Sequence, residues 1–292
     1  MKYNIAPTHI GILMFAALCH ASWNGIVKSV DNSDKMIVSV LINSGVPALF
    51  FIIAPLLLPD GFISLFNSYD IILIAFLSAL VHSVYWILLP EMYKIMDMSQ
   101  AYPIARGVSP ILVALVAFYV VDDELPFWGI VGVALASLGV LLNAFPKRGQ
   151  PFYFRAILPA LFVGVLITTY TVIDGYGVRL TEEPLRFFAL YGFWKVIFAT
   201  IILILQKNKV KLTFKNNYKM ITIGAVLNGM AYGLVLWMLI IIPFAYVSAL
   251  REISSIFAVL IGILVFKERA GFKRVVFATI TIIGCVIIAV GG

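Results

Sequence analysis

The chain has 292 residues, of which 62% are apolar and 12% charged, and its mean hydropathy is +1.05. A soluble globular domain has about a quarter of its residues charged, so this composition excludes that class and predicts an integral membrane protein. The net charge of +7 lies mostly in loops, where it bears on membrane orientation and predicts no nucleic-acid partner. Cys19 and Cys285 lie within apolar runs without metal-ligand or CxxC spacing, so we expect no metal site and no disulfide.

Apolar runs of roughly 20 residues, the length that lets a helix cross about 30 Å of hydrocarbon, follow one another along the sequence. They predict an all-α integral membrane fold with ten transmembrane helices, at residues 9–30, 35–58, 70–95, 99–121, 125–145, 153–178, 184–206, 217–241, 245–266 and 270–290. The intervening turns are short, so consecutive helices should pack antiparallel and both termini should lie on one side. The loops on that side carry about three basic residues and the opposite loops about fifteen, which by the positive-inside rule places both termini outside.

The first predicted helix carries polar side chains at the spacing of one helix face. His20, Asn24 and Lys28 are each four residues apart, and Trp23 flanks them. A polar stripe facing lipid would be costly, so this face should point inward. His20 is interpreted either as a structural imidazole or as a substrate contact or proton-linked switch, because its unperturbed pKa lies near physiological pH.

The third predicted helix has a similar aromatic and polar face, formed by His82, Tyr85 and Trp86 at spacings of three and one. Membrane aromatics usually form interfacial belts or pack between helices. These three lie near mid-depth instead, so a role in a cavity is the alternative.

Two stretches of the chain resemble each other at a separation of 145 residues. The matches that carry most weight pair Arg106 with Arg251, Ser109 with Ser254, and Gly139 with Gly284. Each half would contain an odd number of spans, so the second copy would enter the membrane from the opposite side as an inverted repeat. We therefore expect two inverted five-helix repeats, residues 1–147 and 148–292, an organisation found mainly in transporters.

The two matching arginines are the main functional signal. Each lies about two turns, roughly 10 Å, inside its helix, where a charge faces a cavity or a partner. Arg106 and Arg251 either tie helices together or face an anionic substrate, and their repetition favours the substrate. At opposite depths they would lie roughly 10 Å apart across the hydrocarbon and act in turn. Glu252 either neutralises Arg251 or belongs to the site.

The second half contributes further polar side chains. Asn228 and Tyr232 are four residues apart on the eighth predicted helix and share a face. Asp174 lies near a predicted helix end and is interpreted as a solvated rim charge. Lys195 lies eleven residues into its span, so it needs a carboxylate partner or a path to water.

The run SALREISSIFAVLIGILVFKERAGFKRVVFATITIIGCVIIAV resembles the closing segment of EamA-type members of the drug/metabolite transporter superfamily. The similar features are a polar start to helix nine, Glu268 at its end and Gly284 midway along helix ten. HASWNGIVK resembles the family's opening helix, and the likeness extends over essentially the whole chain. It implies a secondary transporter of small organic solutes with a cavity lined by helices one, three, four, six, eight and nine.

Two features depart from what the resemblance implies. The family is usually drawn with both termini in the cytoplasm, whereas the basic residues predict the opposite orientation. The small four-helix multidrug members use a glutamate in their first helix for proton exchange, and this sequence has none there. Their coupling mechanism therefore cannot be transferred.

These observations predict a multi-pass transporter of the cytoplasmic membrane that moves an amino acid or another small carboxylate- or phosphonate-bearing solute by alternating access. It would need no cofactor, could work as a monomer in the lipid bilayer, and could use a coupling proton or ion. The alternatives are export of hydrophobic or cationic compounds, with arginines that only tie helices, or a scaffold, sensor or intramembrane enzyme. The predicted substrate-binding residues are His20, Trp23, Asn24, His82, Tyr85, Trp86, Tyr102, Arg106, Asn228, Tyr232, Arg251 and Glu252.

Overall fold

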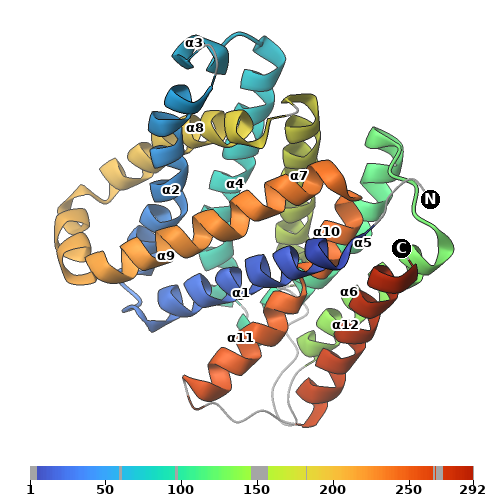
Figure 1. The fold of residues 1–292 in the computed structure, drawn as a ribbon. Helices are drawn as coiled ribbons and strands as arrows, with labels where there is room; N and C mark the ends of the chain where they lie inside the picture. The colour runs from blue at the N-terminus through green and yellow to red at the C-terminus, as the bar shows by residue number, and fades with distance from the viewer. Residues whose placement is uncertain are drawn as a thin grey trace.

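All the secondary structure described in a computed structural model of the chain is helical (Figure 1). The described residues are 5–58, 61–95, 98–145, 157–181, 183–265, 267 and 272–291, and some helical side chains, including that of Tyr102, lie outside this description. The helices are α1 (Pro7–Ser29), α2 (Lys35–Leu57), α3 (Gly61–Leu65), α4 (Tyr69–Ile95), α5 (Met98–Val121), α6 (Phe127–Leu141), α7 (Ile157–Thr181), α8 (Pro184–Leu205), α9 (Lys207–Ile241), α10 (Phe244–Leu250), α11 (Ile253–Leu264) and α12 (Phe272–Gly291), with a 3-10 turn, η1 (Leu142–Ala144), after α6.

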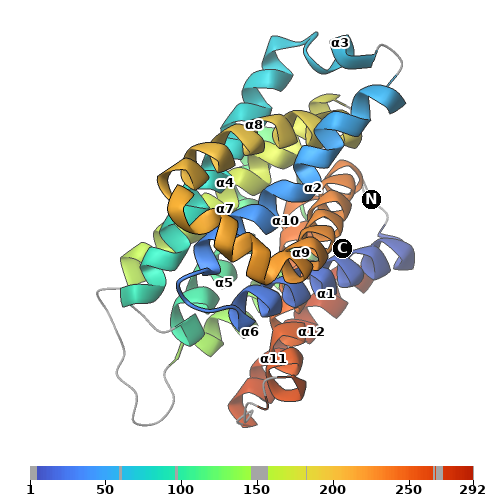
Figure 2. The same ribbon diagram turned by 90° about the vertical axis from the view of Figure 1, so that its left-hand side faces the viewer.

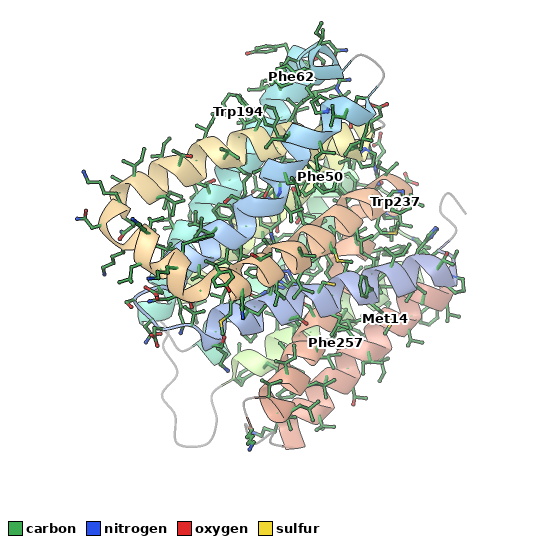
Figure 3. All side chains as sticks on the ribbon, turned by 60° about the vertical axis from the view of Figure 1, so that its left-hand side comes forward. Met14, Phe50, Phe62, Trp194, Trp237 and Phe257 are labelled. Atoms are coloured by element: carbon green, nitrogen blue, oxygen red, sulfur yellow. The ribbon has the colours of Figure 1, made fainter. Side chains whose placement is uncertain are left out.

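The predicted ten-helix membrane fold is confirmed. Among the described residues, nine helical spans are long and apolar enough to cross a membrane, and Val275–Gly291 adds a shorter apolar helix. Large apolar side chains on the outside, such as Met14 on α1, Phe62 on α3 and Trp237 on α9, are exposed in Figure 3. Such side chains suit contact with lipid tails, because hydrocarbon is as apolar as they are.

Two predicted boundaries are wrong. The basic segment at 207–216, predicted as a loop, is the first part of α9. It contains no proline or glycine, and Asp34, just before α2, holds it in place. The Asp34 carboxylate accepts hydrogen bonds from Thr213 Oγ1 at 2.8 Å and from Asn217 Nδ2 at 3.2 Å.

The ninth predicted helix, residues 245–266, is interrupted at Arg251 and Glu252, which form a turn between α10 and α11 (Figure 1). The amide of Glu252 bonds to the Ala249 carbonyl at 3.0 Å, and the amide of Ser254 bonds to the Arg251 carbonyl at 3.0 Å. These tighter i to i+3 bonds replace α-helical ones. They place the predicted intramembrane arginine at a break in the helix.

Helices α6 and α12 lie side by side (Figures 1 and 2). This pair is separate from the group formed by α2, α4, α7, α8 and α9. Glycines allow this close approach. A Cβ added to Gly139 would meet Thr281 and the Phe277 carbonyl, and one added to Gly284 would lie 2.7 Å from the Gly132 carbonyl. Small residues at such contacts let membrane helices pack backbone against backbone.

Two contacts join residues that are 145 positions apart. Thr281 Oγ1 donates to the Ala136 carbonyl at 3.5 Å, and an Arg106 guanidinium nitrogen donates to the Arg251 carbonyl at 3.2 Å. In the aligned repeats each of these residues therefore contacts its own equivalent, which is expected only near a two-fold axis. The two inverted repeats stay a prediction, and these two contacts mark where their axis would lie.

Candidate functional site

A cavity of about 50 Å³ lies between α1, α2, α4, α7, α8 and α9, beside the break between α10 and α11. Six aromatic side chains line it: Trp23, Tyr85, Trp86, Tyr170, Tyr191 and Tyr232. The polar and charged side chains at the wall are His20, Asn43, His82, Asn228 and Arg251. This volume holds a few water molecules.

Eight of the twelve predicted substrate-binding residues meet at this cavity. They are His20, Trp23, His82, Tyr85, Trp86, Asn228, Tyr232 and Arg251. Asn24 lies one position beyond Trp23, and its Nδ2 donates to the His20 carbonyl at 2.8 Å within α1. Tyr102 lies on α5, and its side chain is outside the described part of the structure.

Arg251 is a cation at the cavity wall. Its backbone forms the turn between α10 and α11, and its side chain is half-buried. Among the residues that the structure describes, no hydrogen bond or ion pair engages the Arg251 guanidinium. Its positive charge thus lies at the wall of the cavity.

Arg106, the repeat equivalent of Arg251, has different surroundings. Only 3% of it is exposed, and one of its guanidinium nitrogens lies 3.0 Å from Glu252 Oε1. The same guanidinium also donates to the Arg251 carbonyl and to Ser254 Oγ, each at 3.2 Å. Arg106 and Glu252 therefore form a buried tie between α5 and the break after α10.

This tie corrects two expectations. The arginines were expected roughly 10 Å apart in depth, yet the Arg106 side chain reaches the backbone of Arg251. Glu252 was expected either to neutralise Arg251 or to join the site, and it pairs with Arg106 instead. The physical reason is the helix break, which presents a backbone carbonyl and a carboxylate to α5.

Asp174 on α7 is the centre of a buried polar network beside the cavity. Its carboxylate accepts hydrogen bonds from Ser78 Oγ and, at 2.7 Å, from the Tyr232 hydroxyl, and His82 Nε2 lies 3.2 Å away. The interpretation of Asp174 as a solvated rim charge is wrong, because only 1% of it is exposed. The cause is the length of α7, which continues to Thr181 and leaves Asp174 well inside the helix.

His82 is held on several sides by its neighbours. Its ring stacks on Tyr170 at a centroid distance of 3.9 Å and meets Tyr191 and Tyr232 edge-on at 5.3 and 5.4 Å. Together with the contact to Asp174, this packing fixes the orientation of the imidazole at the cavity wall. His82 is therefore positioned to make a directed hydrogen bond.

The predicted substrate-binding residues did not include Tyr170, Tyr191 or Asn43, which line the cavity. One signal was available, because Tyr170 precedes Asp174 by four residues and Tyr191 precedes Lys195 by four. Aromatic and ionisable residues at that spacing share a helix face. Asn43 lies within an otherwise apolar run of α2, where a buried amide is a similar indication.

The ten-helix membrane fold and a polar, aromatic-walled cavity between its helices are features of membrane carriers. The model of the EamA-like transporter family matches residues 154–290. The match covers most of the second half of the chain, and it supports a membrane transporter of the drug/metabolite transporter type. The resemblance found in the sequence is confirmed.

A solved structure, described as the crystal structure of a protein, shares the fold along almost the whole chain. The TM-score is 0.74 at 15% sequence identity, over 97% of this chain and 98% of the other. Comparison with curated proteins gives no significant match.

Proposed function

We propose that the protein is a secondary transporter that moves a small organic anion, such as an amino acid or another carboxylate- or phosphonate-bearing metabolite, across the cytoplasmic membrane. The observation that carries this proposal is the contrast between the two arginines. Glu252 neutralises Arg106, whereas Arg251 faces the cavity without such a partner among the described residues.

An anionic ligand would complete the surroundings of Arg251. A charge within a membrane protein is costly unless it is paired or hydrated. A guanidinium offers a planar fork of donors that matches a carboxylate or phosphonate in two parallel hydrogen bonds. Arg251 would therefore bind the anionic group of the substrate.

The other cavity residues would orient the rest of the molecule. Asn43, His82 and Asn228 supply hydrogen-bonding groups at the wall. The aromatic rings contribute apolar contact and would attract the ammonium group of an amino acid through cation–π interactions. This combination favours a small zwitterion or anion with an apolar part.

Alternating access would follow from exchange of conformations between the two inverted repeats. The contacts between positions 145 apart would then lie near the axis about which the repeats rock. The cavity, which has residues from both halves in its wall, would open in turn to each side of the membrane.

The test is a thermal-stability screen of the purified protein in detergent with L-glutamate, L-aspartate and 2-aminoethylphosphonate. A ligand that binds only the folded state raises apparent stability, by about 2.7 kcal/mol at a hundred times its dissociation constant. We expect at least one of these anions to stabilise the wild type and Arg251→Gln to abolish the shift. Lys215→Gln, which removes an exposed charge on α9, is the matched control and should keep it.

A second function is favoured by the six aromatic side chains and the buried Asp174, which would also suit an apolar cation. Tetraphenylphosphonium in the same screen separates the two proposals. Stabilisation by this cation, equal in the wild type and in Arg251→Gln and without any effect of the anions, would select a multidrug type of transport.

A further inference from the structure

Lys195 is a fully buried cation that the proposed substrate contacts do not use. It lies midway along α8 with 0% of its surface exposed. Its Nζ lies 2.8 Å from the centroid of the Trp86 ring and 5.1 Å from that of Tyr191. Both rings belong to the cavity wall, so Lys195 lies directly behind that wall.

The Lys195 side chain is poorly supported as a permanent ion. An ammonium has three N–H donors, yet Nζ has no hydrogen-bond partner among the described residues. The aromatic faces offset only part of the cost of burying the charge. A lysine in such surroundings changes its charge state more readily than an arginine would.

The nearby carboxylate is already occupied. Asp174 acts on Lys195 through its electric field, but its oxygens accept hydrogen bonds from Ser78 and Tyr232 and face His82. These partners hold the Asp174 carboxylate in position. It can compensate a proton on Lys195 without forming a direct ion pair.

The ionisable groups around Lys195 come from α8 itself and from three of the helices packed against it, α4, α7 and α9. They are His82 from α4, Asp174 from α7, Tyr191 from α8 and Tyr232 from α9. Arg251, at the break after α10, acts electrostatically on His82. Lys35, the ionisable residue of α2, is at the first position of that helix, and α3 has none. The residue free to exchange a proton in this group is Lys195, because His82 and Tyr232 already contact Asp174.

We propose that Lys195 is the proton-binding residue that couples this transporter to a proton gradient, with Asp174 as its fixed counter-charge and Trp86 as the barrier between Lys195 and the cavity. The inference rests on the proposed function. The amine takes a proton from a hydronium ion on one side of the membrane, giving an ammonium and water, and the ammonium returns the proton to water on the other side.

Trp86 links proton exchange to the transport cycle. Its ring separates Nζ from the cavity, so water reaches Lys195 only when the wall rearranges. A proton on Lys195 adds positive charge directly behind the cavity wall and so strengthens binding of an anion in the cavity. By reciprocity the anion also strengthens proton binding, and the two are transported in the same direction.

The first experiment needs no substrate. Tryptophan fluorescence of the purified protein is recorded from about pH 5 to 10, and the Trp86 contribution is taken as the difference between wild type and Trp86→Phe. The ammonium lies directly over the indole, so we expect a one-proton step in this difference. Lys195→Met and Lys195→Gln should each abolish it, and His82→Gln should retain it.

A flat difference signal, or a step that survives in both Lys195 variants, would overturn the proposal. A step lost in His82→Gln but kept in Lys195→Met would also overturn it, because the proton would then belong to the imidazole. Methionine has a similar length to lysine and removes an unpaired charge, so the variant should fold. Elution as a single species on size-exclusion chromatography checks this.

The second experiment measures coupling in proteoliposomes with radiolabelled L-glutamate and 2-aminoethylphosphonate. We expect the wild type to accumulate a probe when the outside is acidic, and Lys195→Met to exchange the probe while its accumulation ratio falls to about one. Accumulation by Lys195→Met equal to the wild type would overturn the proposal. If the wild type exchanges neither probe, the proposed substrate class fails, and the fluorescence experiment still decides the role of Lys195.

Discussion

Arg106 and Arg251 occupy equivalent positions in two aligned segments, yet their side chains have different roles. One is held by Glu252, Ser254 and a carbonyl, and the other faces a cavity. The difference depends on Glu252, because its repeat equivalent is Gly107, which has no side chain to pair with an arginine. A single acidic residue thus separates an arginine held in a buried ion pair from one that lines a cavity.

At the residue scale, the buried ion pair between Arg106 and Glu252 predicts that substitutions of its two partners have non-additive effects on stability. Removing one partner of such a pair leaves an uncompensated charge and costs about 3–5 kcal/mol. We expect Arg106→Gln and Glu252→Gln to lower stability by this amount each, and the double variant to lose much less than their sum. Reversible unfolding in mixed micelles gives the three values. If the single effects simply add, the pair does not contribute to stability in the way proposed here.

The cavity residues on α1 and α4 could be predicted from the sequence because His20, His82 and Trp86 are polar or amphipathic in apolar runs. The residues on α7 and α8 were harder to predict. Both helices are mostly apolar, and packing decides which of their aromatic residues turn inward. For the same reason Lys195 stood out as costly, but its place behind Trp86 follows only from the tertiary structure.

At the scale of elements, the sequence predicted the ten spans well and the break in the ninth helix poorly. Periodicity and length identify a span, but the segment from Tyr246 to Ile261 contains no proline or glycine to indicate an interruption. The break coincides with contacts made by Arg106, a residue about 145 positions away. Long-range polar contacts of this kind leave no pattern in the sequence around the break.

Close packing between α6 and α12 predicts that a substitution of Gly284 lowers stability, whereas a substitution of a glycine outside this contact does not. In Gly284→Ala the added Cβ would lie 2.9 Å from the Ala136 Cα and 2.7 Å from the Gly132 carbonyl. These are backbone atoms that cannot move aside, so we expect a loss of about 1–3 kcal/mol. Thermal unfolding in detergent measures it.

Gly233→Ala on α9 is the control, because nothing lies within 4 Å of its added Cβ. Alanine is favoured over glycine in a helix by about 0.5–1 kcal/mol, so this variant should be unchanged or slightly more stable. Equal destabilisation by both variants would argue against backbone contact between α6 and α12.

At the scale of the whole molecule, Asp123 and Arg179 connect the two halves of the chain at a second place. Their charged atoms are 2.8 Å apart, and the Asp123 carboxylate also accepts the backbone N–H of Phe244 at 2.9 Å. Arg179 reaches the carbonyls of Leu239 and Ile242 at the end of α9. This group of contacts fixes the start of α10 against both halves.

We expect Asp123→Asn to loosen this connection and to expose Cys285, which packs against Ala249 on α10. Hydrogen bonds to charged groups contribute about 1.5–3 kcal/mol, so maleimide labelling of Cys285 in a Cys19→Ser background should become about tenfold faster or more. The exposed neighbour Glu124, changed to glutamine, is the control. Equal labelling rates in the two variants would contradict the expectation.

The contact between Ala136 and Thr281 has a consequence for evolution and engineering. If the two repeats exchange conformations during transport, a contact on their axis is converted into itself. A substitution there changes the free energies of the inward-facing and outward-facing states by nearly the same amount. Substitutions at such positions would change the stability of both states together. Substitutions away from the axis would change the ratio of the inward-facing to the outward-facing population.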